Sequence, residues 1–253
     1  MYTKEDLIRD MEVMGVDPKG TLLVHSSMKS IGEVDGGADT VLDAMMEYMK
    51  DGLLVLPTHT WDRVNREHPV FRAAEEDSCV GILTNLFRKR PGVIRSLHPT
   101  HSVAAYGKDA AGYTAGEEKQ TTPCHRSGCW GRLYDRKAKI LFLGCRLTSN
   151  TYLHGVEEWN GIPGTLRDYA EVYTVIAPDG TEYTVPQYRH SGGASVHYGK
   201  MEPVFLRHGA LKYGTFGDAR CVLCDAVGMA DITKKCLEKN PRLFRCEDLP
   251  EDE

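Results

Sequence analysis

The chain has 253 residues, of which 41% are hydrophobic and 26% are charged, and its 31 basic and 36 acidic side chains give a net charge of −5. These proportions are ordinary for a globular protein and exclude a disordered or fibrous one, and the acidic balance argues against nucleic acid as the main partner but suits a cationic substrate. No apolar run approaches the ~20 residues that span a bilayer. The amphipathic, acid-bearing residues 1–15 are atypical of a signal or transit peptide. We therefore expect a cytoplasmic protein, monomeric or homodimeric, that does not bind a membrane.

The first part of the chain alternates helix and strand patterns. Apolar residues at helical spacing predict a helix over 3–15, and the apolar run 21–24 predicts a buried strand. After a polar loop over 25–32, the same reasoning predicts a helix over 38–50 and a second strand over 53–56. This succession of strand, polar loop, helix and strand is typical of an α/β domain.

The remainder of the chain continues with shorter elements and a hairpin. Polar residues 62–78 are expected to form a surface excursion. The other predicted elements are helices over 80–90, 150–159 and 226–239 and strands over 102–105, 140–143 and 221–224. Residues 171–176 and 182–185 flank a Pro-Asp-Gly turn, which predicts a β-hairpin. We expect one α/β domain over 1–253, built on a mixed sheet flanked by helices, with a hairpin-bearing carboxyl-terminal third.

Eight cysteines are scattered along a chain without an export signal, which favours free thiols. A zinc site at Cys221, Cys224, Cys236 and Cys246 is the alternative. Zinc sites usually contain two close ligand pairs, whereas the last two of these cysteines are nine residues apart. Residues 221–224 also resemble a short buried strand, in which cysteine acts as a small hydrophobe. We therefore expect no metal, and zinc in the purified protein would contradict this.

Three polar, histidine-bearing segments follow predicted strands or lie beside them, at 25–32, 57–61 and 98–102. Ligand sites of α/β proteins lie at the carboxyl ends of strands. The hydroxyls, backbone amides and Lys29 of the first segment suit a phosphate group. The first segment alone is equally compatible with a solvated turn, and a single histidine in any of the three is more often a hydrogen-bonded structural residue than a catalyst.

A fourth segment, 150–159, places acids three and four residues after His154. On a helix these positions share a face, so Glu157 or Glu158 can reach the imidazole. A histidine held by a carboxylate has a fixed orientation and tautomer and suits the role of general base. The alternative is an exposed ion pair near the start of a helix.

Five segments taken in order resemble the aminoglycoside 3-N-acetyltransferase family: TLLVHSSMKSIGEVDGGADTVLDAM, LPTHTW, HPTHSVAAYG, GRLYDRKAKILFLG and NTYLHGVEEW. The resemblance is collinear from about residue 5 to 240. It implies transfer of an acetyl group from acetyl-CoA to the 3-amino group of a 2-deoxystreptamine antibiotic, and hence resistance. It also implies a fold unrelated to the GNAT superfamily, whose R-x-x-G-x-A loop is matched by chance at 189–194.

The resemblance implies roles for individual residues. His154 is expected to be the general base and Glu157 its orienting partner. The residues expected along the CoA phosphates and pantetheine are Ser26, Ser27, Lys29, Ser30 and Gly32, and those expected near the thioester are Thr58, Ser102 and Val103. Lys29 replaces the arginine of many members, which keeps the charge but loses the planar fork. Candidate acids that steer the cationic antibiotic are Asp62, Glu67, Glu158 and Asp168.

A neutral amine attacks a thioester directly, so the expected mechanism needs no covalent enzyme intermediate, only a base for the ammonium proton and donors for the developing oxyanion. The amino-terminal part is expected to bind mainly CoA and residues from about 150 to 253 to complete the acceptor pocket.

Two alternatives stay open. One is an enzyme of the same architecture that acylates another amine, because fold and donor do not fix the acceptor. The other is a non-catalytic CoA- or metal-binding protein.

Overall fold

The computed structural model describes residues 1–251, and its centre is a mixed seven-stranded sheet with the order β4-β5-β2-β1-β6-β10-β9. Its strands are β1 (Thr21–Ser26), β2 (Leu53–Pro57), β4 (Ile94–Arg95), β5 (Val103–Gly107), β6 (Lys139–Leu143), β9 (Leu211–Phe216) and β10 (Ala219–Asp225). β1 pairs in parallel with β2 and β6, and every other pair is antiparallel. The three parallel strands are almost wholly buried, which explains their continuous apolar sequences.

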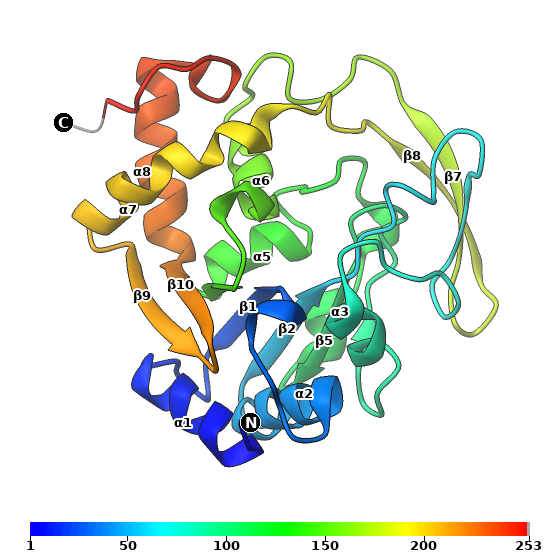
Figure 1. The fold of residues 1–253 in the computed structure, drawn as a ribbon. Coiled ribbons are helices and arrows are strands. Elements are labelled where there is room, and N and C mark those ends of the chain that lie inside the picture. The colour runs from blue at the N-terminus through cyan, green and yellow to red at the C-terminus, as the bar shows by residue number, and fades with distance from the viewer. Residues whose placement is uncertain (252–253) are drawn as a thin grey trace.

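Helices cover both faces of this sheet (Figure 1). On one face lie α1 (Lys4–Val13), α2 (Gly37–Tyr48) and α3 (Ile82–Phe87), and on the other α4 (Ala110–Thr114), α5 (Cys129–Asp135), α6 (Thr151–Trp159), α7 (Glu202–Arg207) and α8 (Ala226–Lys239). Neighbouring residues of β1 face opposite sides, so Leu22 and Val24 belong to the core cluster on the α1 side and Leu23 to the cluster on the α8 side. The mixed sheet, its helical layers and the hairpin confirm the predicted fold class.

A second, three-stranded sheet lies to one side of the first (Figure 1). Its strands are β3 (Val70–Arg72), β7 (Glu171–Ile176) and β8 (Glu182–Gln187), in the order β3-β7-β8. β7 and β8 are the predicted hairpin, and Phe71 of β3 packs with Tyr173 and Val175 in a small core of their own. The surface excursion predicted over 62–78 is therefore wrong in part, because this polar stretch contains a strand and the buried side chains Val64, Phe71 and Ala73.

The helices and strands predicted from apolar runs all occur, with ends shifted by a few residues. Elements without such a run were missed, among them α5, α7 and β9. Five 3-10 helices were also not predicted: η1 (Met28–Ser30), η2 (Glu117–Lys119), η3 (Leu147–Ser149), η4 (Ala194–Met201) and η5 (Leu243–Arg245). No helix within residues 1–251 has the length and apolar character needed to cross a membrane.

All eight cysteines are free. Cys221 and Cys224 are buried on β10, and Cys236 is buried on α8. The described chain does not bring these three together with Cys246 as a ligand set. Its one group of potential metal ligands is Cys124, Glu158 and His190.

Candidate functional site

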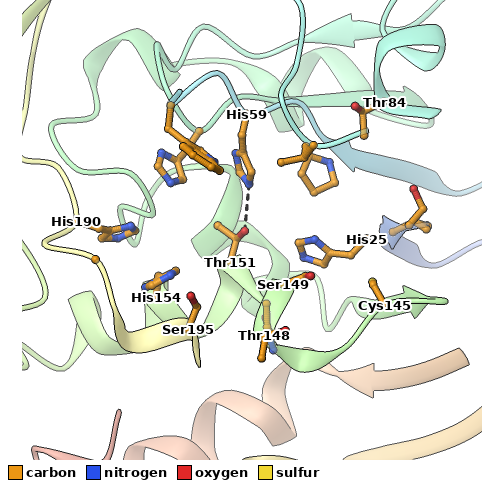
Figure 2. A pocket seen from close by; sticks show the side chains of 18 of the residues that line it. His25, His59, Thr84, Cys145, Thr148, Ser149, Thr151, His154, His190 and Ser195 are labelled. Atoms are coloured by element: carbon orange, nitrogen blue, oxygen red, sulfur yellow. Dashed lines mark hydrogen bonds between the residues drawn. The ribbon is translucent and has the colours of Figure 1, made fainter. Parts of the chain in front are cut away.

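A cavity of about 590 Å³ opens where the carboxyl ends of the parallel strands β1, β2 and β6 meet (Figure 2). Ligand sites of α/β sheets lie at such an edge. The residues that line it are Val24, His25, Ser26, Pro57, His59, Trp61, Val80, Thr84, His101, Cys145, Thr148, Ser149, Asn150, Thr151, His154, Arg189, His190, Gly192, Gly193 and Ser195. They come from the ends of strands and the loops beside them, from α3, η3 and α6, and from the segment that follows β8.

The cavity has two ends that differ in composition. Figure 2 places His25 and Cys145 toward one end, where β1 and β6 finish, and His154 and His190 toward the other. Between the two ends the Nε2 of His59 lies 3.0 Å from the hydroxyl of Thr151, the first residue of α6. A ligand that spans the cavity therefore passes this central pair.

His154 and Glu157 lie one helical turn apart on α6, with His154 Nδ1 3.6 Å from Glu157 Oε2. The hydroxyl of Tyr198, from η4, bridges them: it donates to Glu157 Oε2 and lies 2.7 Å from His154 Nδ1. A tyrosine hydroxyl has one hydrogen, so in the second bond its oxygen accepts and Nδ1 donates. The Nε2 of His154 is then left with a free electron pair. Sequence reasoning missed Tyr198 because it lies 44 residues from His154 and no local pattern marks it.

Glu157 is almost completely buried, and groups other than Tyr198 also compensate its charge. Its side chain is 1% exposed, with the guanidinium of Arg245 3.4 Å from Oε1 and the hydroxyl of Thr165 at 3.5 Å. A buried carboxylate with several donors is held in one orientation. The side chain of His154 is 17% exposed, so of this pair the histidine is the one that faces the cavity.

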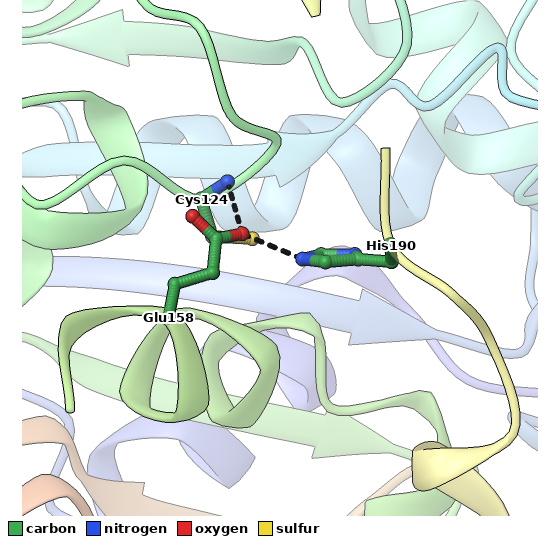
Figure 3. Close-up of side chains that lie close together, drawn as sticks. All are labelled: Cys124, Glu158 and His190. Atoms are coloured by element: carbon green, nitrogen blue, oxygen red, sulfur yellow. Dashed lines mark hydrogen bonds and ion pairs between the residues drawn. The ribbon is translucent and has the colours of Figure 1, made fainter. Parts of the chain in front are cut away.

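The next residue, Glu158, pairs with a different histidine (Figure 3). Its Oε1 lies 2.6 Å from His190 Nε2 and accepts a bond from the backbone N–H of Cys124 at 3.0 Å. Burial raises the pKa of Glu158 to about 7 and holds the pKa of His190 well below its usual range. The imidazole of His190 stacks on that of His154 with 4.5 Å between ring centroids. The two hydrogen bonds to Oε1 account for the proximity of Cys124, Glu158 and His190 without a metal ion.

The other histidines around the cavity are held neutral; His25 and His59 are buried and His101 is half-buried. Burial lowers the pKa of His25 to about 3, and it holds the pKa values of His59 and His101 well below the ordinary one. Desolvation favours the uncharged imidazole. His25 also stacks on Phe142. The centre of the cavity is thus polar but carries little charge.

The structure places the predicted CoA residues in three settings. Ser26 lines the cavity, whereas Ser27, Lys29, Ser30 and Gly32 lie on or beside η1, directly after β1, and do not contribute to its wall. Lys29 is exposed, and the hydroxyl of Ser30 bonds to the carbonyl of Gly144.

Thr58, Ser102 and Val103 were expected near the thioester but are fully buried and absent from the cavity wall. The hydroxyls of Thr58 and Ser102 lie 2.9 Å apart, and Arg95 Nε donates to both at 3.2 Å. Arg95 also donates to the Thr58 carbonyl at 2.8 Å. These hydroxyls therefore serve an internal network around a buried guanidinium.

The predicted acidic residues do not line the cavity either. Asp62, Glu67 and Asp168 lie outside its wall, and Glu158 lies behind His190. The wall instead contains Arg189, which begins the segment 189–194 that matches the loop pattern of another superfamily by chance. The wall residues from this part of the chain are Arg189, His190, Gly192, Gly193 and Ser195.

The family model for aminoglycoside 3-N-acetyltransferase matches residues 23–238. The chain is 25% identical to the SPbeta prophage-derived aminoglycoside N(3')-acetyltransferase-like protein YokD of Bacillus subtilis, over 94% of this chain and 93% of that protein. Among solved structures, an alanine mutant of aminoglycoside acetyltransferase AAC(3)-IVa in complex with a gentamicin superimposes with a TM-score of 0.84 at 23% identity, over 96% of this chain and 91% of that one. AAC-IIIb in its binary complex with CoASH superimposes with a TM-score of 0.80 at 24% identity, over 94% and 97%.

The family model covers most of the chain, and the solved relatives share its fold over nearly their whole length. The protein therefore belongs to the aminoglycoside 3-N-acetyltransferase family and is an acyltransferase.

Proposed function

We propose that the protein transfers the acetyl group of acetyl-CoA to a primary amine that His154 deprotonates. The observation that carries this proposal is the position of His154 at the cavity wall, with its Nδ1 bonded to Tyr198 and its Nε2 free to accept a proton. Family membership and a relative crystallised with CoASH support acetyl-CoA as the donor.

The reaction needs a base because an alkylamine is largely protonated near pH 7. His154 Nε2 takes the ammonium proton, the amine nitrogen bonds to the thioester carbon, and the carbon–sulfur bond then breaks. The imidazolium returns this proton to the departing CoA thiolate, and the new amide nitrogen releases its second excess proton to solvent, so the products are the neutral amide, CoA thiol and one free proton. Glu157 and Tyr198 stabilise the imidazolium from the Nδ1 side, and a positioned base of this kind contributes roughly 10²–10⁴-fold to the rate.

The two ends of the cavity suit the two substrates. The donor enters from the β1 end, where Ser26 lines the wall and the η1 segment with Lys29 supplies a positive charge beyond it. The acceptor enters from the His154 end. The thioester then lies at the centre, where the Thr151 hydroxyl and His59, rather than Thr58, Ser102 or Val103, offer polar contacts to the developing oxyanion.

The first candidate acceptor is the 3-amino group of a 2-deoxystreptamine aminoglycoside, on the strength of family membership and of the relative in complex with a gentamicin. Acetylation at this position would confer resistance. The second candidate is a different amine, and the composition of the cavity wall favours it. A polycation is normally steered by carboxylates, whereas the predicted acids Asp62, Glu67 and Asp168 lie outside the twenty residues of the wall.

A thiol-release assay tests the proposal, with acetyl-CoA, a panel of gentamicin, kanamycin, apramycin and a simple polyamine, and mass spectrometry of the products. One added acetyl group on the 3-amine of an aminoglycoside supports the first acceptor. Turnover of the polyamine alone supports the second. The His154→Ala variant is the control for enzyme-dependent release, and CoA binding without release on any amine would contradict the proposed activity for this panel.

A further inference from the structure

We propose that the His154 end of the cavity binds an acceptor amine through a carboxylate on the same molecule, and that Arg189 is the residue that binds this carboxylate. The inference rests on the proposed function, since it names the class of amine that the enzyme acetylates. It predicts an acceptor that is an amino acid or a related zwitterion rather than a polycation.

The charge of the wall is the first observation. Its twenty residues, all within the described part of the chain, include five histidines and one side chain with a permanent charge, the guanidinium of Arg189. Burial keeps His25, His59, His101 and His190 neutral. An amine with several positive charges would meet a fixed cation here, whereas a carboxylate would meet its preferred partner.

Arg189 is held in place by contacts that compensate its charge only in part. Its Nη2 donates to the carbonyl of Trp61 at 2.8 Å, and its Nη1 lies 3.6 Å from the carboxylate of Glu171. The same carboxylate has a closer partner in Arg167, at 2.7 Å. Two guanidiniums thus share one negative charge, and Arg189 is the one of the two that lines the cavity.

The backbone beyond Arg189 leaves room for a ligand. Gly192 and Gly193 both line the cavity with φ of +85°, and a Cβ at either position would meet no atom within 4 Å. Residues other than glycine rarely adopt this left-handed backbone conformation. The wall beside Arg189 is therefore open, with Ser195 next along the same segment as a polar contact.

The position of Arg189 in the cavity indicates that it binds a substrate carboxylate and not a CoA phosphate. Arg189 precedes His190, whose ring stacks on the ring of the proposed base His154. The residues expected to bind the CoA phosphates follow β1, and Figure 2 places His25 of β1 toward the opposite end of the cavity from His154 and His190. If the carboxylate of a substrate binds to Arg189, an amine that is a few bonds from this carboxylate in the same molecule lies next to His154.

Kinetics with matched probes test the inference. The probes are 4-aminobutyrate, 6-aminohexanoate and 4-(aminomethyl)benzoate, each compared with its carboxamide and with kanamycin, in the thiol-release assay at saturating acetyl-CoA. We expect kcat/KM to be about 10- to 100-fold higher for at least one carboxylate than for its carboxamide, which is the effect of a hydrogen-bonded charge. Arg189→Gln should abolish this preference and Arg189→Lys should keep part of it, with the KM for acetyl-CoA unchanged.

Arg167→Gln is the matched control, because Arg167 pairs with the same carboxylate of Glu171 but does not line the cavity. This variant should keep the preference. If kanamycin is acetylated faster than every carboxylate, this inference is overturned and the proposed function stays intact. A raised KM for acetyl-CoA in Arg189→Gln with an unchanged acceptor preference would also overturn it, because the bound anion would then be a CoA phosphate.

Binding without turnover keeps the two proposals separable. Calorimetry on the His154→Ala variant with acetyl-CoA bound measures the affinity for the three carboxylates directly. If the carboxylates bind, and Arg189→Gln weakens this binding at least tenfold, the carboxylate site is supported. This holds even if no probe is acetylated, in which case only the proposed function fails. No binding of any carboxylate would overturn the inference.

Discussion

The Nδ1 of His154 lies 3.6 Å from the Glu157 carboxylate, and the Tyr198 hydroxyl is within hydrogen-bonding distance of both. The expected orienting role of Glu157 is therefore indirect in this structure, because the tyrosine transmits it. The direction of the two bonds sets the tautomer of His154 and leaves Nε2 as the atom that accepts a proton. Tyr198 is thus a positioning residue for the proposed base.

Replacement of His154 by alanine should lower kcat by at least two orders of magnitude, because the ammonium form of the acceptor would lose its base. The affinity for CoA should stay nearly unchanged, since only one wall residue toward the acceptor end is shortened. Steady-state kinetics and calorimetry with CoA measure the two effects. Activity within about threefold of wild type would show that another group accepts the proton.

Replacement of Tyr198 by phenylalanine keeps the buried ring but removes the bridge between His154 and Glu157. We expect kcat to fall by about tenfold, the order of one charge-assisted hydrogen bond. Tyr152→Phe is the control, because that hydroxyl, also buried, bonds to the Ala226 carbonyl instead. Equal kcat values in Tyr198→Phe and wild type would exclude the positioning role.

Replacement of Ser102 by alanine should affect stability rather than donor binding. Its hydroxyl bonds to Arg95 and to Thr58 in the interior, so the guanidinium would lose one of its buried partners. We expect the free energy of unfolding to fall by about 1–3 kcal/mol, measured by urea denaturation, while the KM for acetyl-CoA stays within about twofold. A tenfold rise in that KM at unchanged stability would restore the thioester role that the sequence suggested.

The sequence predicts most of the fold because periodic apolar runs such as 21–24, 53–56 and 140–143 mark the buried parallel strands. It also predicts that His154 and Glu157 lie close together, because they are one turn apart on one helix. It does not predict Arg189 and His190 at the cavity or Tyr198 beside His154, because all three come from a segment whose position depends on tertiary contacts. Thr58 and Ser102 were misplaced for a related reason: a polar residue after a strand can face a ligand or a buried arginine, and only the packing decides.

Replacement of Lys29 by alanine should raise the KM for acetyl-CoA by roughly three- to tenfold, as expected for the loss of one exposed phosphate contact. Lys29 is exposed on η1, directly after β1. Lys29→Arg keeps the charge and should stay near wild type. Both variants are to be compared at saturating acceptor. A normal donor KM combined with weaker acceptor binding would place Lys29 outside the phosphate path.

Acid should destabilise the protein through its buried neutral histidines, and His98 offers the cleanest measurement. Its Nδ1 accepts bonds from the backbone N–H groups of Thr100 and His101, and its Nε2 lies 3.2 Å from the Thr122 carbonyl, so both nitrogens are used by the neutral tautomer. Burial lowers the pKa of His98 to about 4, whereas an unfolded histidine titrates near 6.5.

The unfolded chain therefore takes up this proton first, and the stability that His98 contributes above about pH 6.5 is lost progressively as the pH falls toward 4. Between pH 7.5 and 5.0 this amounts to about 2 kcal/mol. Glu117 and Glu158, whose pKa burial raises to about 7, act in the opposite direction, since their contribution is lost as the pH rises through 7. The measurement is thus the difference between wild type and His98→Gln in urea denaturation at the two pH values. The wild type should lose about 2 kcal/mol more than the variant, with the exposed His68→Gln as control; equal losses in all three proteins would mean that His98 is not held neutral.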